Sequence, residues 1–142
     1  MGWARRFNQA VGYYLSNMTS KDPRIIVDVD DTITIHASAK SYSAKQPNIA
    51  VVEKLREYQN RGFEIILYTA RNMYTHKGDL SKINLQTAPI LMKWLDEHNI
   101  PCDGLIMGKP WCGDGGFYVD DKAIRPNEFV NSTYEEIKKL IE

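Results

Sequence analysis

Cysteine is one of the scarcest residues in this sequence. The 142 residues include two, Cys102 and Cys112, which stand ten positions apart. Two thiols are too few for a disulfide framework or for the four ligands of a structural zinc site. The sequence therefore predicts two ordinary reduced thiols in a fold that is stabilised by its hydrophobic core.

Long hydrophobic runs are missing as well. No stretch approaches the roughly 20 apolar residues that a membrane-spanning helix needs, and no secretory hydrophobic segment follows Met1. These two absences predict a protein without a membrane span, and they make the cytoplasm its expected compartment.

An excess of charge of either sign is the third absence. Eighteen Lys and Arg residues balance eighteen Asp and Glu residues. Proteins that bind duplex nucleic acid need a basic field to engage the phosphates, so this partner is not expected, although a local basic pocket is still allowed. The hydrophobic fraction of 43% is typical of a globular protein, and the length suits about one domain.

What the sequence does contain is a group of acids at the end of a hydrophobic run. The β-branched residues from Ile25 to Val27 predict a strand at about 24–29 that is buried on both faces. Asp28, Asp30 and Asp31 lie at its end. Three such close acids repel one another and resist burial, so a positive charge is expected nearby. The alternative is a solvated acidic turn.

The rest of the chain alternates strands with helices. Further strands are predicted at residues 63–68, 105–107 and 116–119. Helices are predicted from the N-cap Asn48 to Gly62, over residues 79–99 with a kink or break at Pro89, and after a capping box of Ser132 and Glu135. This alternation predicts an α/β fold with a mainly parallel sheet and right-handed crossovers.

Every predicted strand ends in polar or charged residues. The ends of parallel strands meet at one edge of the sheet, where we expect six side chains to gather: Asp28, Asp30, Thr69, Lys109, Asp120 and Asp121. So many carboxylates need a cation, and oxygen ligands without a His or Cys cluster select a hard ion such as Mg²⁺. A carboxylate can attack phosphorus, while a second acid moves the proton and a Lys and a Thr hold phosphoryl oxygens. The set therefore predicts phosphoryl transfer through Asp.

The order of these residues along the chain separates two interpretations. Receiver domains of two-component signalling use a similar set, but there the acidic pair comes first and the Lys comes last. Here Asp120 and Asp121 follow Lys109, and no isolated strand-end Asp lies between Asp31 and Thr69. The order is Asp28-Val-Asp-Asp-Thr32, then Thr69, Lys109 and Asp120-Asp121. This order resembles the four motifs of the haloacid dehalogenase (HAD) superfamily of phosphatases.

A narrower resemblance is carried by longer segments of the chain. They are Thr69-Ala-Arg-Asn-Met, Pro89 with Trp94-Leu95, Gly108-Lys-Pro-Trp111, and residues 116–126. Together they are similar to the capsule-biosynthesis phosphatase subfamily. That similarity implies hydrolysis of a phosphomonoester, such as a sugar phosphate or related metabolite, in the assembly of capsule or other surface polysaccharide.

The resemblance also implies a role for each residue of the cluster. Asp28 would be the nucleophile, which forms an aspartyl-phosphate, and Asp30 would be the general acid and base. Thr69 and Lys109 would hold the phosphoryl group. Mg²⁺ would be bound by Asp28, by the main-chain carbonyl of Asp30 and by Asp120, with Asp121 ligating or orienting beside it.

The implied fold is a three-layer Rossmann-like HAD domain over residues 23–142. HAD phosphatases differ in their inserted cap domains, but the chain between Thr32 and Phe63 leaves room only for a small hairpin flap, with residues 32–35 and 41–43 as its arms. An uncapped site is open, so either the substrate is large or a neighbouring subunit helps to close it.

Three further residues are candidates for substrate binding. Arg71 and Asn72 follow the strand end at Thr69, and Trp111 follows Lys109. Arg71 can bind a phosphate or carboxylate with two hydrogen bonds, or it can pair with the acidic cluster. Trp111 can stack on a sugar ring, or it can pack at the core or rim.

Residues 1–22 stand apart from this domain. Their large apolar side chains recur at helical spacing, at Trp3, Phe7, Ala10, Val11 and Tyr14. They predict an amphipathic helix that packs on its own domain or forms a homo-oligomer. Three functional alternatives stay open: a phospho-accepting signalling domain, a phosphatase acting on a protein or a nucleic-acid end, and a non-catalytic partner that recruits an enzyme through this helix.

Overall fold

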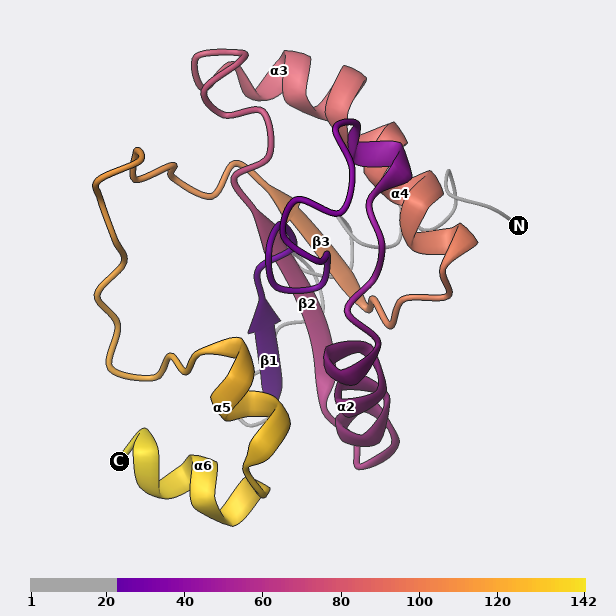
Figure 1. Cartoon of the computed structure of the whole chain (residues 1–142). Helices are drawn as coiled ribbons and strands as arrows, with labels where there is room; N and C mark the ends of the chain where they lie inside the picture. The colour runs from indigo at the N-terminus through magenta and orange to yellow at the C-terminus, as the bar shows by residue number, and fades with distance from the viewer. Residues whose placement is uncertain (1–22) are drawn as a thin grey trace.

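The structure, a computed structural model, describes residues 23–142. Its centre is a three-stranded parallel sheet in the order β1-β2-β3 (Figure 1). The strands are β1 (Arg24–Val27), β2 (Glu64–Thr69) and β3 (Gly104–Met107). This confirms an α/β fold with a parallel sheet. The helix predicted for residues 1–22 lies outside the described residues.

The first α-helix of the described residues, α2 (Ile49–Asn60), begins and ends where the sequence predicts. The side chain of Asn48 accepts a hydrogen bond from the backbone N–H of Val51 at 3.4 Å, which caps the helix. Its apolar stripe is buried, and Gly62 follows with φ +96°, a conformation that ends a helix and favours glycine. Local sequence signals therefore suffice to place this element.

The second helical region is divided by Pro89. It consists of α3 (Leu80–Lys82), a π-helical turn η2 (Ile83–Thr87) and α4 (Ala88–Glu97). Proline has no N–H to donate within a helix, and it stands in the first turn of α4, directly after the π turn. Thr87 directly precedes α4, but its side chain does not cap the helix, because its hydroxyl donates to Asn72 instead.

The core lies on one face of the sheet. The pairings Ile25 with Ile65 and Val27 with Leu67 put these four side chains on the same face, together with Leu105 of β3. Both crossovers advance in the same direction, so right-handedness places α2 and α4 on that face. Because the order of the described strands never reverses, both crossover helices cover the same face of the sheet. The three-layer arrangement stays a prediction.

The fourth strand, predicted at residues 116–119, is not formed. Residues 108–125 run as a long loop from the end of β3 to α5 (Pro126–Asn131), which Figure 1 shows in orange beside the sheet. A turn that joins Gly116 N–H to the carbonyl of Gly113 takes up the start of the predicted strand. Phe117 and Val119 are 78% and 87% exposed.

As a result, β1 is an edge strand within the described part of the chain. The prediction that it is buried on both faces is wrong, because Ile26 is 53% exposed while its paired neighbour Ile66 is buried.

The chain ends in α5 and α6 (Tyr134–Leu140). The predicted capping box is displaced by one residue: Thr133, not Ser132, accepts the hydrogen bond of a first-turn N–H, that of Glu136 at 3.2 Å. Ser132 is instead the extended residue that ends α5. Phe129 of α5 stacks on Tyr58 of α2, and this contact fixes the C-terminal helices to the core.

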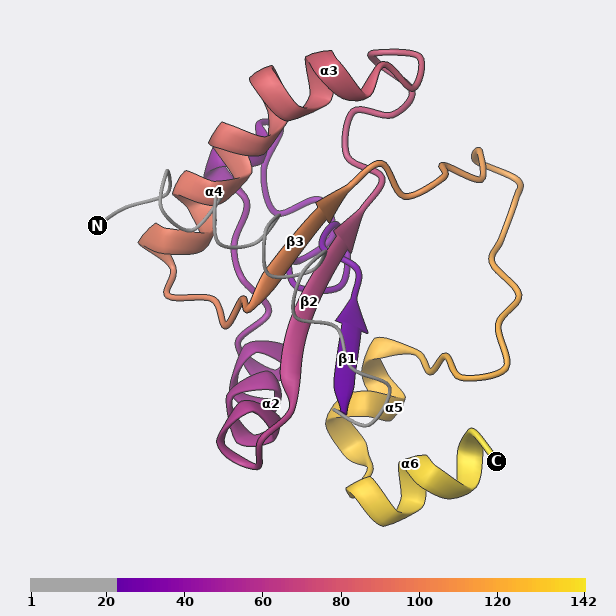
Figure 2. The ribbon, with the colours of Figure 1, turned by 180° about the vertical axis from the view of Figure 1, so that it is seen from behind.

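The segment between β1 and α2 is a short strap, residues 35–46. It is closed by one antiparallel bridge, Thr34 with Pro47, and by the hydrogen bond from Ile35 N–H to the carbonyl of Gln46 at 2.8 Å. The predicted hairpin arm at 41–43 is wrong, because η1 (Tyr42–Ala44) is a 3₁₀ turn. This turn packs on α4, as Figure 1 and the opposite view in Figure 2 agree.

Within residues 23–142, the longest apolar helical segments fall short of what crossing a membrane requires.

Candidate active site

Asp28 and Lys109 meet at the carboxyl edge of the sheet, by which we mean the side where the C-terminal ends of the parallel strands lie; the amino edge is the side where the strands begin. Asp28 follows β1, and Lys109 stands two residues beyond β3. The Lys109 ammonium Nζ donates to Asp28 Oδ1 at 3.2 Å, across 81 positions of sequence. The hydroxyl of Thr32 donates to the other carboxylate oxygen, Oδ2, also at 3.2 Å. The convergence predicted from the strand ends is therefore present for this pair.

The Asp28 carboxyl is partly buried, and this burial shifts its pKa. Burial raises its pKa above the ordinary value of 3.8, and the negative charge of Asp30 adds to the rise. The Lys109 charge and the hydrogen bonds from Lys109 and Thr32 lower the pKa but do not cancel the effect of burial. A further cation beside Asp28 would favour its ionised form.

Thr69 links the second strand end to Lys109. It is fully buried at the end of β2, and its carbonyl accepts from the Lys109 N–H at 3.0 Å. Its hydroxyl oxygen accepts from the Arg71 N–H at 3.1 Å, which leaves the hydroxyl hydrogen able to donate.

Gly108 sets the direction in which the chain reaches Lys109. It has φ +90°, and a Cβ there would lie 2.6 Å from Cδ2 of Leu80. The left-handed conformation favours glycine, and a Cβ at this position would also force the end of the Leu80 side chain to shift.

Asp30 has a different partner from Asp28. Its carboxylate accepts two hydrogen bonds from the Arg71 guanidinium, at 2.8 Å from Nη2 and 3.2 Å from Nε. The Arg71 side chain is 1% exposed, and the ring of Tyr42 lies 4.2 Å from its guanidinium carbon. Of the two roles weighed for Arg71 in the sequence, the structure contains the ion pair with the acidic cluster.

Two of these contacts could not be found in the sequence. Thr32 was visible only as part of a motif, and Tyr42 only as one aromatic residue in an irregular segment. Asp31 behaves as a turn residue, with φ +62°.

Asp120 and Asp121 lie outside this group of contacts. Both are exposed on the loop after β3, and Asp120 Oδ1 accepts from the Lys122 N–H at 2.8 Å. Their predicted position depends on the fourth strand, which is not formed. Within residues 23–142, no three His, Cys, Asp or Glu side chains gather as a metal-binding group.

The donors beside Asp28 still suit a hard cation. Mg²⁺ is usually held by one or two carboxylates, with water and substrate phosphate completing its shell. Asp28 supplies a carboxylate, and the main-chain carbonyl of Asp30 follows within the same turn. The residues at this edge therefore fit Mg²⁺ in chemistry, with fewer protein ligands gathered than the sequence predicts.

The remaining substrate-binding candidates, Asn72 and Trp111, differ in what their side chains contact. Asn72 uses its amide inside the protein, since its oxygen accepts from the Thr87 hydroxyl at 2.9 Å and its nitrogen donates to Thr75 at 3.4 Å. Trp111 lies at the rim, with its ring 4.9 Å from that of Tyr74. The two aromatics border a hollow of about 440 Å³, lined also by Met73, Thr75, Lys77 and Gly78.

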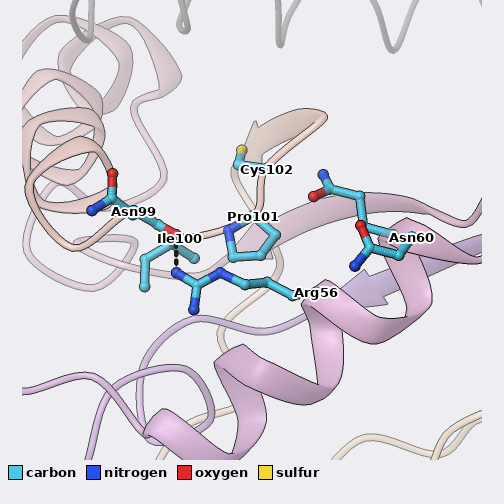
Figure 3. Close-up of a pocket in the computed structure, with 7 residues that line it drawn as sticks. Arg56, Asn60, Asn99, Ile100, Pro101 and Cys102 are labelled. Carbon is cyan, nitrogen blue, oxygen red and sulfur yellow. Dashed lines mark hydrogen bonds between the residues drawn. The ribbon is translucent and has the colours of Figure 1, made fainter.

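A second hollow lies at the opposite end of the sheet (Figure 3). Arg56 of α2 reaches across it and donates to the carbonyl of Asn99 at 2.6 Å. Pro101 and Cys102, which also line it, precede β3, whereas Lys109 follows that strand. Because the strands are parallel, this hollow is at the amino edge and shares no residue with the candidate site.

Comparison with known proteins gives one match. The chain is 49% identical to a structural-genomics target from Vibrio cholerae that has a crystal structure, with a TM-score of 0.81. The match covers 84% of this chain and 96% of the other, and the description of that protein names no activity. No protein-family model matches the chain, and no curated protein matches it significantly.

Proposed function

We propose that this chain, which belongs to one family with the Vibrio cholerae protein, is a Mg²⁺-dependent phosphomonoester hydrolase of the HAD superfamily. The observation that carries the proposal is the contact between Asp28 and Lys109, 3.2 Å apart at the carboxyl edge of a parallel sheet. Thr69 at the neighbouring strand end supports it. This edge is where open α/β sheets bind their ligands.

The proposed reaction has two displacements at phosphorus. The Asp28 carboxylate attacks the phosphorus, the bond to the leaving oxygen breaks, and Asp30 gives that oxygen a proton. Asp30 then takes a proton from a water molecule, whose oxygen attacks the aspartyl-phosphate. The bond to Asp28 breaks and inorganic phosphate leaves.

Lys109 and Thr69 would stabilise the charge that develops on the phosphoryl oxygens. The Lys109 side chain is 18% exposed, so its charge acts in surroundings where it is worth more than in open water. The Thr69 hydroxyl can donate to a second oxygen.

Mg²⁺ would be held by the Asp28 carboxylate and by the main-chain carbonyl of Asp30, with water and phosphate oxygens completing its shell. The bound ion would neutralise negative charge that the carboxylate and the phosphate bring together.

The substrate in this proposal is a phosphorylated small molecule, and a sugar phosphate in the assembly of surface polysaccharide fits the subfamily resemblance best. Trp111 and Tyr74 offer exposed ring faces, and a hollow of about 440 Å³ lies within the range of small-molecule sites. Trp111 is two residues from Lys109, so a leaving group held there stays close to the phosphoryl group.

The test is hydrolysis of p-nitrophenyl phosphate with Mg²⁺ by the wild type, by Asp28→Asn and by Asp103→Asn. Asp103 is the matched control, because it is a partly buried Asp at the amino edge of the same sheet. We expect Asp28→Asn to abolish hydrolysis and a phosphoryl group to be trapped on Asp28 in the wild type. An Asp28→Asn variant that retains full activity would refute the nucleophile. An aspartyl-phosphate without steady-state phosphate release would instead indicate a signalling domain.

A further inference from the structure

The Arg71 guanidinium is almost enclosed by protein. Nε and Nη2 hold the Asp30 carboxylate, and the ring of Tyr42 lies against the guanidinium at 4.2 Å. The third nitrogen, Nη1, is buried and has no hydrogen-bond partner among the described residues. A group this confined keeps whatever orientation its two side-chain neighbours impose.

The Asp30 carboxylate and the Tyr42 ring restrict different motions of the Arg71 guanidinium. The double hydrogen bond sets the guanidinium in the plane of the Asp30 carboxylate, while the Tyr42 ring covers its face. Without the ring, Arg71 and Asp30 could tilt together about their shared hydrogen bonds. The position of the Asp30 carboxylate therefore depends on Tyr42, whose ring contacts the guanidinium that holds that carboxylate.

Tyr42 is supplied by the strap and not by the sheet. Its 3₁₀ turn is anchored by α4, since the indole N–H of Trp94 donates to the carbonyl of Lys45 at 2.8 Å. Asp30 and Arg71, in contrast, stand on the loops that follow β1 and β2. The contact between Tyr42 and Arg71 thus connects the strap to the proposed acid.

We propose that Tyr42 is a positioning residue for Asp30 that acts through Arg71, and that the strap is thereby part of the proton-transfer machinery. This role rests on the proposed function. Its consequence is selective, because a misplaced acid matters most where the leaving oxygen needs a proton. Esters of alcohols depend on that proton far more than esters of acidic phenols do.

The experiment compares two phosphate esters that differ in leaving group, glycerol 2-phosphate and p-nitrophenyl phosphate. The variants are Tyr42→Leu and Tyr42→Met, which remove the ring, and Tyr42→Phe, which keeps it. Asp30→Asn is the reference for loss of the acid, and Ser43→Ala is the control in the same turn. Tyr42 is 39% exposed, so these changes leave no core cavity, and thermal unfolding checks each fold.

We expect Tyr42→Leu and Tyr42→Met to lower kcat for the alkyl ester about tenfold or more, with a change of less than about twofold for the aryl ester. Asp30→Asn should show the same selective loss of kcat on the alkyl ester, and the loss should be larger. Tyr42→Phe and Ser43→Ala should resemble the wild type on both esters. The pH dependence of kcat for the alkyl ester should also change in the ring-deleted variants.

Equal losses on both esters, or no loss on the alkyl ester, would overturn the role of Tyr42 while leaving the proposed function in place. A wild-type chain that hydrolyses neither ester would overturn the proposed function and this role together.

Discussion

The two edges of the sheet use acids in different ways. At the amino edge, Asp103 accepts from the Ile65 N–H at 2.8 Å and from the Gln59 amide, and Arg24 pairs with Glu64 at 3.1 Å. These bonds connect neighbouring strands and α2 to one another. At the carboxyl edge, Asp28 faces the end of a Lys side chain from a distant loop.

Burial does not distinguish these edges. It raises the pKa of Glu64 at the amino edge as it raises that of Asp28 at the carboxyl edge. The difference lies in the partners: Asp103 accepts from a backbone N–H that the sheet holds in place, whereas Asp28 pairs with the ammonium of Lys109, which can turn to a phosphate. We infer that the amino edge stabilises the fold and that the carboxyl edge keeps charge available for a ligand.

Replacing one cation at each edge should give the largest contrast. Lys109→Ala removes the positive charge beside Asp28, and we expect it to cost about 3 kcal/mol of transition-state stabilisation, or about a hundredfold in kcat. Arg24→Ala at the amino edge should leave kcat unchanged. Steady-state kinetics with p-nitrophenyl phosphate measures both. A loss below about tenfold in Lys109→Ala would make Lys109 a structural residue and remove the contrast.

Removing Asp103 at the amino edge should lower stability and leave catalysis unchanged. Asp103→Ala leaves the buried N–H of Ile65 without its acceptor, and we expect it to lower the free energy of unfolding by about 1–3 kcal/mol. Its kcat should equal that of the wild type. Urea denaturation and kinetics on the same preparation separate the two effects. A fall in kcat with unchanged stability would show that the edges are coupled.

Substitutions at two glycines test how the backbone positions Lys109. Gly108 and Gly113 both have positive φ, so alanine should cost each site about 1–2 kcal/mol. A Cβ at Gly108 also meets Leu80, while a Cβ at Gly113 has no described atom within 4 Å. We therefore expect Gly108→Ala to be less stable than Gly113→Ala in urea, and to lose kcat as well. Equal stability of the two variants would mean that the Leu80 side chain moves aside without cost.

The sequence predicts the parts of this site that depend on local signals and on sheet topology. The β-branched run before Asp28 and the hydrophobic run before Thr69 locate two strand ends, and parallel pairing then brings Lys109 to them. The cap at Asn48 follows from its own helix. The boundary error between Ser132 and Thr133 arises because both residues are good helix caps and stand side by side.

Local sequence signals fail to predict two features, the absence of the fourth strand and the contact between Tyr42 and Arg71. Phe117 to Val119 has the composition of a strand, but a strand needs a partner edge, and the glycine turn from Gly113 to Gly116 comes directly before it. Tyr42 meets Arg71 because the strap is anchored on α4 by Trp94, a contact that no spacing in the sequence encodes. Long-range pairing of irregular segments determines both outcomes.

The smallest expected effect is a change in pH dependence that follows from the burial of Asp28. Its pKa is raised in the folded protein, so the group's contribution to stability is fully present below the unfolded pKa of 3.8 and is lost as the pH rises through the folded pKa. Asp28→Asn carries no charge to bury. In metal-free buffer, it should therefore be more stable than the wild type at neutral pH, and this advantage should disappear in acid. Urea denaturation from acid to neutral pH measures the difference. If Asp28→Asn is the less stable protein at neutral pH, the contact with Lys109 outweighs burial, and Asp28 stabilises the fold as Asp103 does at the other edge.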